Sequence, residues 1–352
     1  MTGPGLSTFR RILPQLVALV VILALNTAIA PGFLDIAYAN GRLYGSLIDI
    51  LNRGAPVALL AIGMTLVIAT RGIDLSVGAV MAIAGAVAAA LITSDHSLAV
   101  TVLATLGVGI LCGLWNGALV AFLGIQPIIA TLILMVAGRG IAQLVTEGVI
   151  LTFNDPGLIF IGSGSLASVP FPVILWVFLG IVVSLLFRST ALGLLVEAIG
   201  INRRASSLAG IGTSALLLAV YAASGLCAAV AGIVAAADIR GADANNAGLW
   251  LELDAILAVV VGGNSLMGGR FSIAGSLIGA MIIQSVNTGI LLAGFPPEFN
   301  LVIKAAIIVV ILVVQSPASH TLFAYFKHRP GRAPDAAPAT PPARETGKEA
   351  AR

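Results

Sequence analysis

Long apolar segments, separated by short polar stretches, make up most of this chain. The apolar segments are continuous rather than alternating, and most reach the roughly 17–25 residues that a membrane-spanning helix needs. We predict ten such helices, at residues 12–30, 54–70, 73–92, 98–122, 126–146, 170–187, 213–236, 250–267, 272–293 and 298–315. The predicted fold class is therefore all-α, a polytopic membrane helical bundle.

Composition agrees with this pattern. Apolar residues make up 59% of the 352 residues and charged residues only 9%, whereas soluble domains carry about 25% charge. Backbone groups in lipid must bond internally, which leaves helices or a closed barrel. The net charge of +3 is small and predicts no nucleic-acid partner. Cys112 and Cys227 lie inside apolar segments, where they are expected to be packing residues.

The distribution of charge predicts the orientation, since short cytoplasmic loops collect Lys and Arg. With a cytoplasmic N-terminus (residues 1–11), the inside loops hold Arg10, Arg11, Arg71, Arg188, Arg203, Arg204, Arg270, Lys327 and Arg329. The outside loops then hold Asp35, Asp49, Asp95, Glu147, Asp155, Asp238 and Asp243. The first segment is similar to a signal peptide, but Pro31 disfavours cleavage, so we expect a retained helix. Residues 316–352 are predicted to be a disordered cytoplasmic tail.

Two connections between predicted helices, residues 70–78 and 261–275, are rich in glycine and flanked by short apolar runs. They align with each other, Gly72-x-Asp-Leu-Ser-Val with Gly268-x-Arg-Phe-Ser-Ile. Paired, glycine-broken short helices in two halves of a transporter point to a transport path. Chance similarity between two tight hairpins is the alternative interpretation.

Small residues recur every fourth position at Gly109, Gly113 and Gly117, and again at Gly275 and Gly279. This spacing gives a helix a flat stripe that a second helix can approach closely. The partner helix could belong to the same chain or to another subunit.

Polar residues in or beside the predicted helices are few, and they are the candidates for a translocation path or gate. The candidates are Thr65, Arg71, Asp74, Ser76, Asn116, Asn264, Arg270 and Ser272. Hydroxyls and neutral amides suit an uncharged polyol, which needs donors and acceptors. We expect no carboxylate pair deep in the membrane, which argues against a proton- or sodium-coupled carrier.

Three charged residues need separate interpretations. Asp74 either caps the helix that follows it or pairs with Arg71 or Arg270 in a cytoplasmic gate. Arg139 and Lys304 lie toward the outer ends of their segments, where they are expected to snorkel to the interface.

Catalytic and nucleotide-binding motifs do not occur in the sequence. It contains no Gly-x-x-x-x-Gly-Lys-[Ser/Thr] loop for phosphate. Its three histidines, His96, His320 and His328, fall in predicted loops or the tail, away from any candidate nucleophile. We therefore expect a protein that is not an enzyme and that binds no cofactor or metal. A pump of this kind would have its ATP bound by another chain.

The stretch at residues 197–211 is a polar, doubly basic island of helical character between two apolar segments. Arg203 and Arg204 place it on the cytoplasmic side, where it would offer a handle to a soluble partner.

Four stretches of the chain resemble the permease subunits of ATP-binding-cassette importers of monosaccharides such as ribose, arabinose, xylose and galactofuranose. They are Gly63–Gly78, Gly124–Leu132, Ala198–Ile211 and Gly262–Gly275, in the order the family has. The last stretch, with Gly279-Ala-Met-Ile-Ile-Gln, is most similar to the galactofuranose-type branch.

The resemblance implies several partners. Two permease subunits, a homodimer or a heterodimer, would line one path in the bacterial inner membrane. Cytoplasmic ATPase subunits would carry ATP and Mg²⁺, and a periplasmic sugar-binding protein would dock on the other side. The family's coupling helix corresponds to about residues 190–212, within a permease domain at residues 12–315.

The same resemblance assigns contact with the ATPase to Glu197, Gly200, Ile201, Asn202, Arg203 and Ala205. Two positions depart from the family, since Ile201 and Ser206 replace the usual glycine and alanine. The leading hypothesis is an alternating-access importer of a monosaccharide, driven by ATP hydrolysis on partner chains. The alternatives are a secondary transporter acting alone and a membrane scaffold.

Overall fold

The computed structural model describes residues 4–39, 41–296 and 298–306, with side chains from residue 12 onward. The described chain is mainly helical, as predicted. The helices are α1 (Pro4–Ile29), α2 (Ser46–Arg53), α3 (Ala55–Ala69), α4 (Val77–Thr93), α5 (Leu98–Ala121), α6 (Pro127–Val145), α7 (Pro156–Ser163), α8 (Phe171–Ser189), α9 (Leu192–Ile201), α10 (Arg203–Leu208), α11 (Thr213–Ile239), α12 (Leu251–Val261) and α13 (Ile273–Leu292).

The chain divides into two compact units, Met1–Val302 and Ile303–Arg352. Of the second unit, residues 303–306 are described, and they are helical. Residues 307–315, the second half of the predicted helix at 298–315, and the whole predicted tail at 316–352 therefore lie outside the described residues.

Short antiparallel strand pairs lie in the connections between helices. They are β1 (Ala37–Ala39) with β2 (Arg42–Tyr44), β3 (Leu151–Thr152) with β6 (Gly241–Ala242), and β4 (Ser165–Leu166) with β5 (Val169–Pro170). The pair of β3 and β6 joins two connections far apart in the sequence, which fixes the loop after α11 against the loop after α6.

Six helices among the described residues are long and apolar enough to cross a membrane: α1, α5, α6, α8, α11 and α13. A seventh crossing is formed if α2 and α3, bent by 44°, count as one span. The predicted spans at 73–92 and 250–267 are shorter than expected, because α4 has 17 residues and α12 has 11. In both cases the glycine-rich connection takes residues that we had assigned to a helix.

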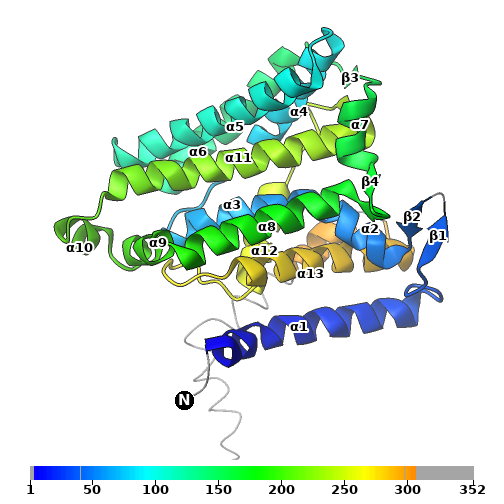
Figure 1. Ribbon diagram of the computed structural model, residues 1–352, viewed down its shortest axis with the longest axis horizontal. Helices are drawn as coiled ribbons and strands as arrows, with labels where there is room; N and C mark the ends of the chain where they lie inside the picture. Colours follow the sequence, from blue (N-terminus) through cyan, green and yellow to red (C-terminus); the bar gives the residue numbers. More distant parts are fainter. Residues whose placement is uncertain (1–3, 40, 297, 307–352) are drawn as a thin grey trace, which may run out of the picture. The chain divides into compact units, whose positions relative to one another are not determined.

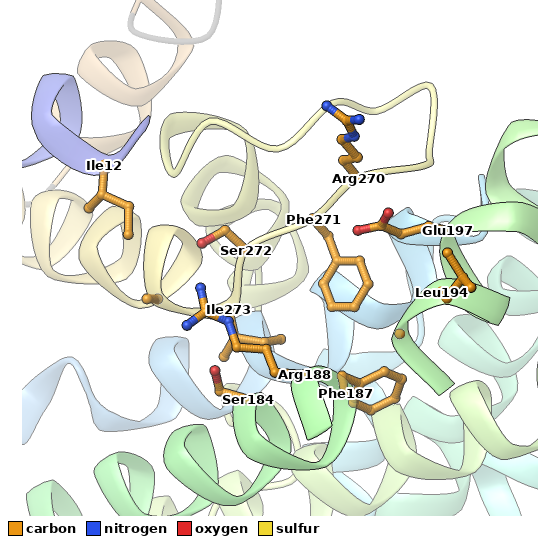
Figure 2. Close-up of a pocket in the computed structure, with 12 residues that line it drawn as sticks. Ile12, Ser184, Phe187, Arg188, Leu194, Glu197, Arg270, Phe271, Ser272 and Ile273 are labelled. Atoms are coloured by element: carbon orange, nitrogen blue, oxygen red, sulfur yellow. The ribbon is translucent and has the colours of Figure 1, made fainter. Parts of the chain in front are cut away.

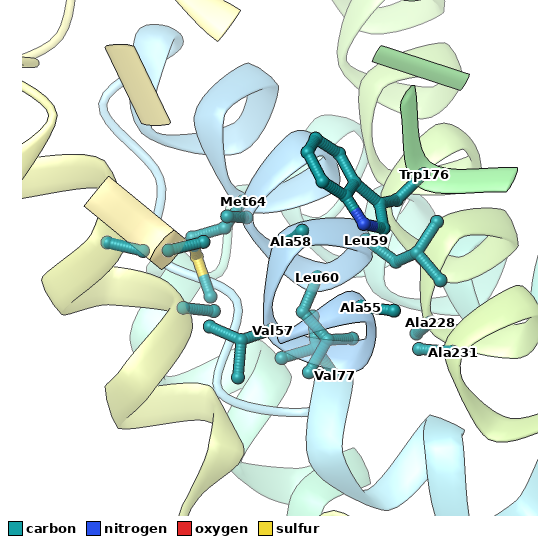
Figure 3. Close-up of a cluster of buried hydrophobic side chains, with 14 of the residues drawn as sticks. Ala55, Val57, Ala58, Leu59, Leu60, Met64, Val77, Trp176, Ala228 and Ala231 are labelled. Atoms are coloured by element: carbon teal, nitrogen blue, oxygen red, sulfur yellow. The ribbon is translucent and has the colours of Figure 1, made fainter. Parts of the chain in front are cut away.

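Helix α3 lies at the centre of the first unit. Every residue of α3 except Pro56 is buried, which is the burial expected of a helix that is apolar on all sides. Leu59, Leu60 and Met64 pack with Trp176 of α8 in the main core cluster (Figure 3). In helices α5, α6 and α8, by contrast, only 22–28% of the residues in the apolar window are buried, as expected of lipid-facing helices.

The glycine stripe of α5 packs within the chain, against α11, and the two helices lie side by side (Figure 1). A Cβ on Gly109 would lie 2.5 Å from the carbonyl oxygen of Gly225, and one on Gly113 would collide with the carbonyl oxygen of Tyr221. Gly275 and Gly279 likewise pack against the backbone of α12. Of the two interpretations of these stripes, the structure shows the intrachain one.

Candidate functional site

The polar island folds as two short helices, α9 and α10, rather than as one coupling helix. Asn202 separates them with an extended backbone, φ −155° and ψ 98°. Its Oδ1 accepts a hydrogen bond from the amide of Ala205 at 3.0 Å, the contact by which an asparagine caps a helix. The hydroxyl of Ser206 donates to the Asn202 carbonyl oxygen at 2.9 Å. Ser206, which departs from the family pattern, is thus buried inside the bend.

Gly200 and Arg203, both assigned to partner contact, lie against the chain's own backbone. A Cβ on Gly200 would collide with the carbonyl oxygen of Ala69 and lie 2.5 Å from the amide nitrogen of Gly269. The Arg203 guanidinium donates to the carbonyl oxygens of Val120 at 3.4 Å and Ala121 at 3.1 Å. It therefore caps the end of α5, where carbonyls lack helical partners.

The outward surface of this segment is more apolar than its sequence suggested. Ala205 and Asn202 are exposed, and Glu197 is half-buried. The side chains of Leu194, Ile201 and Leu208 are 72%, 65% and 85% exposed. Sequence reasoning missed the two leucines, although their spacing of seven residues from Ile201 on either side was readable.

The two glycine-rich connections lie against each other. The Gly269 amide donates to the Ala69 carbonyl oxygen at 2.9 Å, and Arg71 Nε donates to the Met267 carbonyl oxygen at 2.6 Å. Arg71 and Gly269 both have positive φ, 64° and 89°. Helix α9 therefore touches both connections at one point, Gly200.

The two serines of the predicted internal repeat occupy equivalent positions in the structure. Ser76 and Ser272, aligned in the sequence, each precede a helix as its N-cap residue, Ser76 before α4 and Ser272 before α13. Only Ser272 makes the capping bond with its side chain, accepting from the Gly275 amide at 3.1 Å. The Ser76 hydroxyl bonds elsewhere.

Asp74, Ser76 and Asn116 form one buried polar cluster, which Ser224 of α11 completes. Asp74 Oδ1 accepts from the Ser76 hydroxyl at 2.6 Å and amide at 3.0 Å. Asp74 Oδ2 accepts from the Ser224 hydroxyl at 2.8 Å. Asn116 Nδ2 donates to the Ser76 hydroxyl oxygen at 2.8 Å. The cluster joins the start of α4 to α5 and α11.

Neither interpretation of Asp74 matches this arrangement. Helix α4 begins at Val77, and Ser76 is its N-cap residue, so Asp74 lies two residues too early to be the cap. In the described part of the chain no ion pair joins Asp74 to Arg71 or Arg270. Arg71 bonds to a backbone carbonyl, and Arg270 is exposed. Two serine hydroxyls, rather than a cation, satisfy the carboxyl group.

Thr65, Asn264 and Ser272 form a second buried cluster together with Ser276. The Thr65 hydroxyl donates to the Ser276 hydroxyl oxygen at 2.7 Å. Asn264 Nδ2 donates to the same oxygen at 2.9 Å, and Asn264 Oδ1 accepts from the Ser272 amide at 2.6 Å. The cluster joins α3 to the connection between α12 and α13. Six of the eight candidate path residues thus divide into two hydrogen-bonded groups, one at each glycine-rich connection, and Arg71 and Arg270 belong to neither.

Two polar atoms beside the first cluster are buried without a hydrogen-bond partner among the described residues: Asn116 Oδ1 and the Tyr221 hydroxyl. Buried polar atoms are normally paired with protein or water. Tyr221 also borders a small hollow of about 130 Å³ with Thr70, Gly72 and Gln126. Beside the first cluster, Asn116 Oδ1 is therefore an unused hydrogen-bond acceptor, and the Tyr221 hydroxyl is an unused donor.

The structure buries two carboxyl groups that the sequence analysis did not propose. Glu252 and Asp254, in the first turn of α12, are only 4% and 3% exposed. They fell inside a predicted span, but near its start, so they were overlooked. Glu252 lies beside Gly78, where a Cβ would be 2.5 Å from its Oε2.

Arg139, which was expected to snorkel to the interface, bonds to a loop of the chain itself. Its guanidinium donates to the carbonyl oxygens of Ala244 at 3.2 Å and Ala247 at 2.5 Å. These residues belong to the loop between α11 and α12, which approaches the backbone of α4 at Gly248 and Gly78. Arg139 therefore holds an inward-folded loop in place.

Glu197, Arg270 and Ser272 line a cavity of about 690 Å³ bounded by α8, α9 and the start of α13 (Figure 2). Of the remaining candidates on the glycine-rich connections, Asp74, Ser76 and Asn264 are packed in the two clusters described above, whereas Arg71 is exposed and bonds to the Met267 carbonyl oxygen.

Comparison with known proteins identifies the family. The family of the branched-chain amino acid transport system / permease component matches residues 46–312. The chain belongs to this permease family. The match spans both glycine-rich connections and both short helices of the polar island. The permease is thus a multi-pass membrane protein, and its resemblance to importer subunits is confirmed.

Three relatives define its position within the family. The permease is 64% identical over 304 residues to the galactofuranose transporter permease protein YtfT of Escherichia coli (strain K12), covering 86% of this chain and 89% of that one. It is 42% identical to the fructose import permease protein FruF of Bifidobacterium longum (strain NCC 2705), covering 90% of both chains. It is 37% identical to the ribose import permease protein RbsC of Escherichia coli (strain K12), covering 86% and 92%. This order agrees with the predicted galactofuranose-type branch.

Proposed function

We propose that this chain is the membrane subunit of an ATP-driven importer that moves a monosaccharide into the cytoplasm by alternating access. Its family contains permease components, and the relatives described above are named for the transport of galactofuranose, fructose and ribose. The proposed location is the bacterial inner membrane, with both termini in the cytoplasm, on the charge distribution of the loops.

The proposed energy source is an ATPase subunit that holds ATP and Mg²⁺ and docks on α9 and α10. The exposed side chains of Leu194, Ile201 and Leu208 supply the apolar anchor that such an interface needs. The proposed assembly also contains a second permease subunit, identical or paralogous, and a periplasmic sugar-binding protein.

The main observation behind this proposal is the backbone contact of Gly200. Helix α9 meets the Ala69 carbonyl oxygen and the Gly269 amide at one backbone position, and these two atoms are themselves bonded. A displacement of α9 by the ATPase would therefore move both glycine-rich connections together. Tightly packed contacts transmit such shifts because they have little room to deform.

The two polar clusters are the proposed solute contacts. In this structure their hydroxyls and amides bond one another, and the residues of both clusters, including Thr65, Ser76, Asn116 and Asn264, are mostly buried. Separation of the helices would free the same groups to bond the hydroxyls of a sugar, which both donate and accept.

A secondary transporter acting alone is the second candidate. The buried carboxyl groups of Asp74, Glu252 and Asp254 favour it, since proton- and sodium-coupled carriers use acidic groups inside the bundle. The absence of a phosphate loop is compatible with both candidates.

Reconstitution in liposomes distinguishes the two. We expect the full-length chain alone to show no sugar flux under a proton or sodium gradient, and uptake to begin only with the ATPase, the binding protein and ATP. Gradient-driven flux by the lone chain would instead establish the secondary transporter.

A further inference from the structure

The cavity of about 690 Å³ has a chemistry that sugar transport does not explain. It lies where α8 ends, between that helix, the start of α13, α9 and Ile12 of α1 (Figure 2). Helix α1 is held beside it on α13, since Asn26 Nδ2 donates to the Ser285 carbonyl oxygen at 2.9 Å. The cavity is thus an interhelical pocket at one end of the bundle.

Arg188 is the principal cation of the pocket. Figure 2 shows its guanidinium beside Ser184 and Ile273, facing Ser272. Within the described part of the chain, the guanidinium forms no hydrogen bond and no ion pair. The acidic side chain in the lining, Glu197, lies toward Arg270 at the other end of the pocket (Figure 2).

Other donors surround the same space. The hydroxyls of Ser184 and Ser272 border it, and so do Ile273 and Ala274 in the first turn of α13. Amides in the first turn of a helix lack helical partners and favour a negative group. Arginine with hydroxyl and amide donors is the set of groups that binds phosphate.

An apolar groove of about 290 Å³ adjoins the pocket and shares Ser184 and Ala274 with it. It runs between α8 and α13, lined by Trp176, Val177, Gly180, Ile181, Leu185 and Leu277. The floor is narrow at Gly180, where a Cβ would lie 2.7 Å from Leu277 Cδ1. The outer face of α8 beside the groove is apolar and exposed.

The groove has the length of one lipid leaflet. Trp176 and Leu185, at the two ends of the groove, are nine positions apart on α8, which corresponds to about 14 Å along a helix. Half of the hydrocarbon core of a bilayer is about 15 Å thick. A cationic pocket thus lies at the end of an apolar groove that is as long as an acyl chain.

We propose that this pocket and groove bind an anionic phospholipid, with its phosphate at Arg188 and one acyl chain between α8 and α13. Basic pockets between membrane helices bind anionic headgroups. The apolar groove favours a lipid over a soluble phosphate compound, because only a lipid has an acyl chain to fill it. Arg188 and the groove lie outside both polar clusters, and Ser272 is the residue that the pocket shares with them. The site places the headgroup against Leu194 of α9.

The full-length chain, purified in detergent and stripped of lipid, provides the test. Native mass spectrometry would measure retention of dioleoylphosphatidylglycerol, of dioleoylphosphatidylcholine with the same chains, and competition by inorganic phosphate. The variants are Arg188→Gln, Arg188→Lys and Ala274→Phe, which fills the groove. Arg204→Gln, an exposed arginine of α10 outside the pocket, is the matched control.

We expect the anionic lipid to bind in preference to the zwitterionic one, and millimolar phosphate not to displace it. Arg188→Gln and Ala274→Phe should each weaken binding roughly tenfold or more, about 1.4 kcal/mol. Arg188→Lys and Arg204→Gln should stay close to wild type. If Arg188→Gln does not fold, a comparison of lipid binding by Ala274→Phe and by Arg204→Gln tests the proposal instead.

Four results would overturn the proposal. One is equal retention of the anionic and the zwitterionic lipid. Another is displacement of the lipid by phosphate, which would show that the pocket binds a phosphate ion and not a lipid. The third is unchanged lipid binding by folded Arg188→Gln or Ala274→Phe. A chain dimer that Ala274→Phe abolishes, with no lipid bound, would assign the groove to a second copy instead.

Discussion

Gly200 of α9 lies against the carbonyl oxygen of Ala69, the last residue of α3, so closely that a Cβ at Gly200 would overlap it. The same Ala69 oxygen accepts the hydrogen bond from Gly269. One position of the polar island thus touches the end of α3, where the first glycine-rich connection begins, and the second connection itself. Under the proposed function, this contact would transmit a movement of the island to the buried polar clusters.

Loss of the exposed apolar side chains on α9 and α10 should weaken the ATPase interface. We expect Ile201→Ser and Leu208→Ser to reduce recovery of the ATPase with the tagged chain, because apolar anchors dominate such interfaces. Thermal unfolding of the chain alone should not change, since both side chains are mostly exposed. Leu166→Ser, a similarly exposed leucine in β4, is the control, and equal loss there would contradict the assignment.

Removal of the Arg203 guanidinium should loosen the junction between α10 and α5. Arg203→Gln loses the hydrogen bonds to Val120 and Ala121, so we expect a loss of about 1 kcal/mol in the free energy of unfolding. Thermal unfolding in detergent measures it. The neighbouring Arg204→Gln should have little effect, and equal destabilisation by both would show that only charge matters.

Ser224→Ala should destabilise the first polar cluster. It leaves Asp74 Oδ2 buried without its donor, which costs about 1–3 kcal/mol. Ser207→Ala, an exposed serine of α10, should be neutral in the same unfolding measurement. A neutral Ser224→Ala would mean that Asp74 is not held by the serine.

Arg139→Gln should release the inward-folded loop between α11 and α12. The guanidinium holds the carbonyl oxygens of Ala244 and Ala247, and the shorter glutamine cannot reach both. We expect faster hydrogen exchange in peptides covering residues 241–250, while peptides from α3 keep their protection. Unchanged exchange in the loop would show that the strand pair β3–β6 holds it without Arg139.

Periodicity and residue spacing predicted the features set by local chemistry. Continuous apolar runs identified the long helices, and the four-residue glycine spacing identified the surface on which α5 meets α11. The serines aligned between the two connections, Ser76 and Ser272, both precede a helix. Each of these depends on residues close together in the chain.

Features that depend on distant contacts could not be predicted in this way. Arg139 was expected at the interface because its carbonyl partners are more than 100 positions away. Ser224 was not proposed because nothing near it in sequence indicates Asp74. The break at Asn202 was not predicted, because the resemblance to the family implied one coupling helix over about residues 190–212.

The ratio of sugar imported to ATP hydrolysed, in liposomes containing the assembled transporter, tests the central claim most directly. Gly200→Ala should reduce this ratio roughly tenfold, equivalent to about 1.4 kcal/mol, because the added methyl group pushes α9 off Ala69 and Gly269. Gly212→Ala is the matched control, since a Cβ there meets nothing within 4 Å, and it should match wild type. An unchanged ratio in Gly200→Ala, with the protein folded and ATP hydrolysed, would contradict the account.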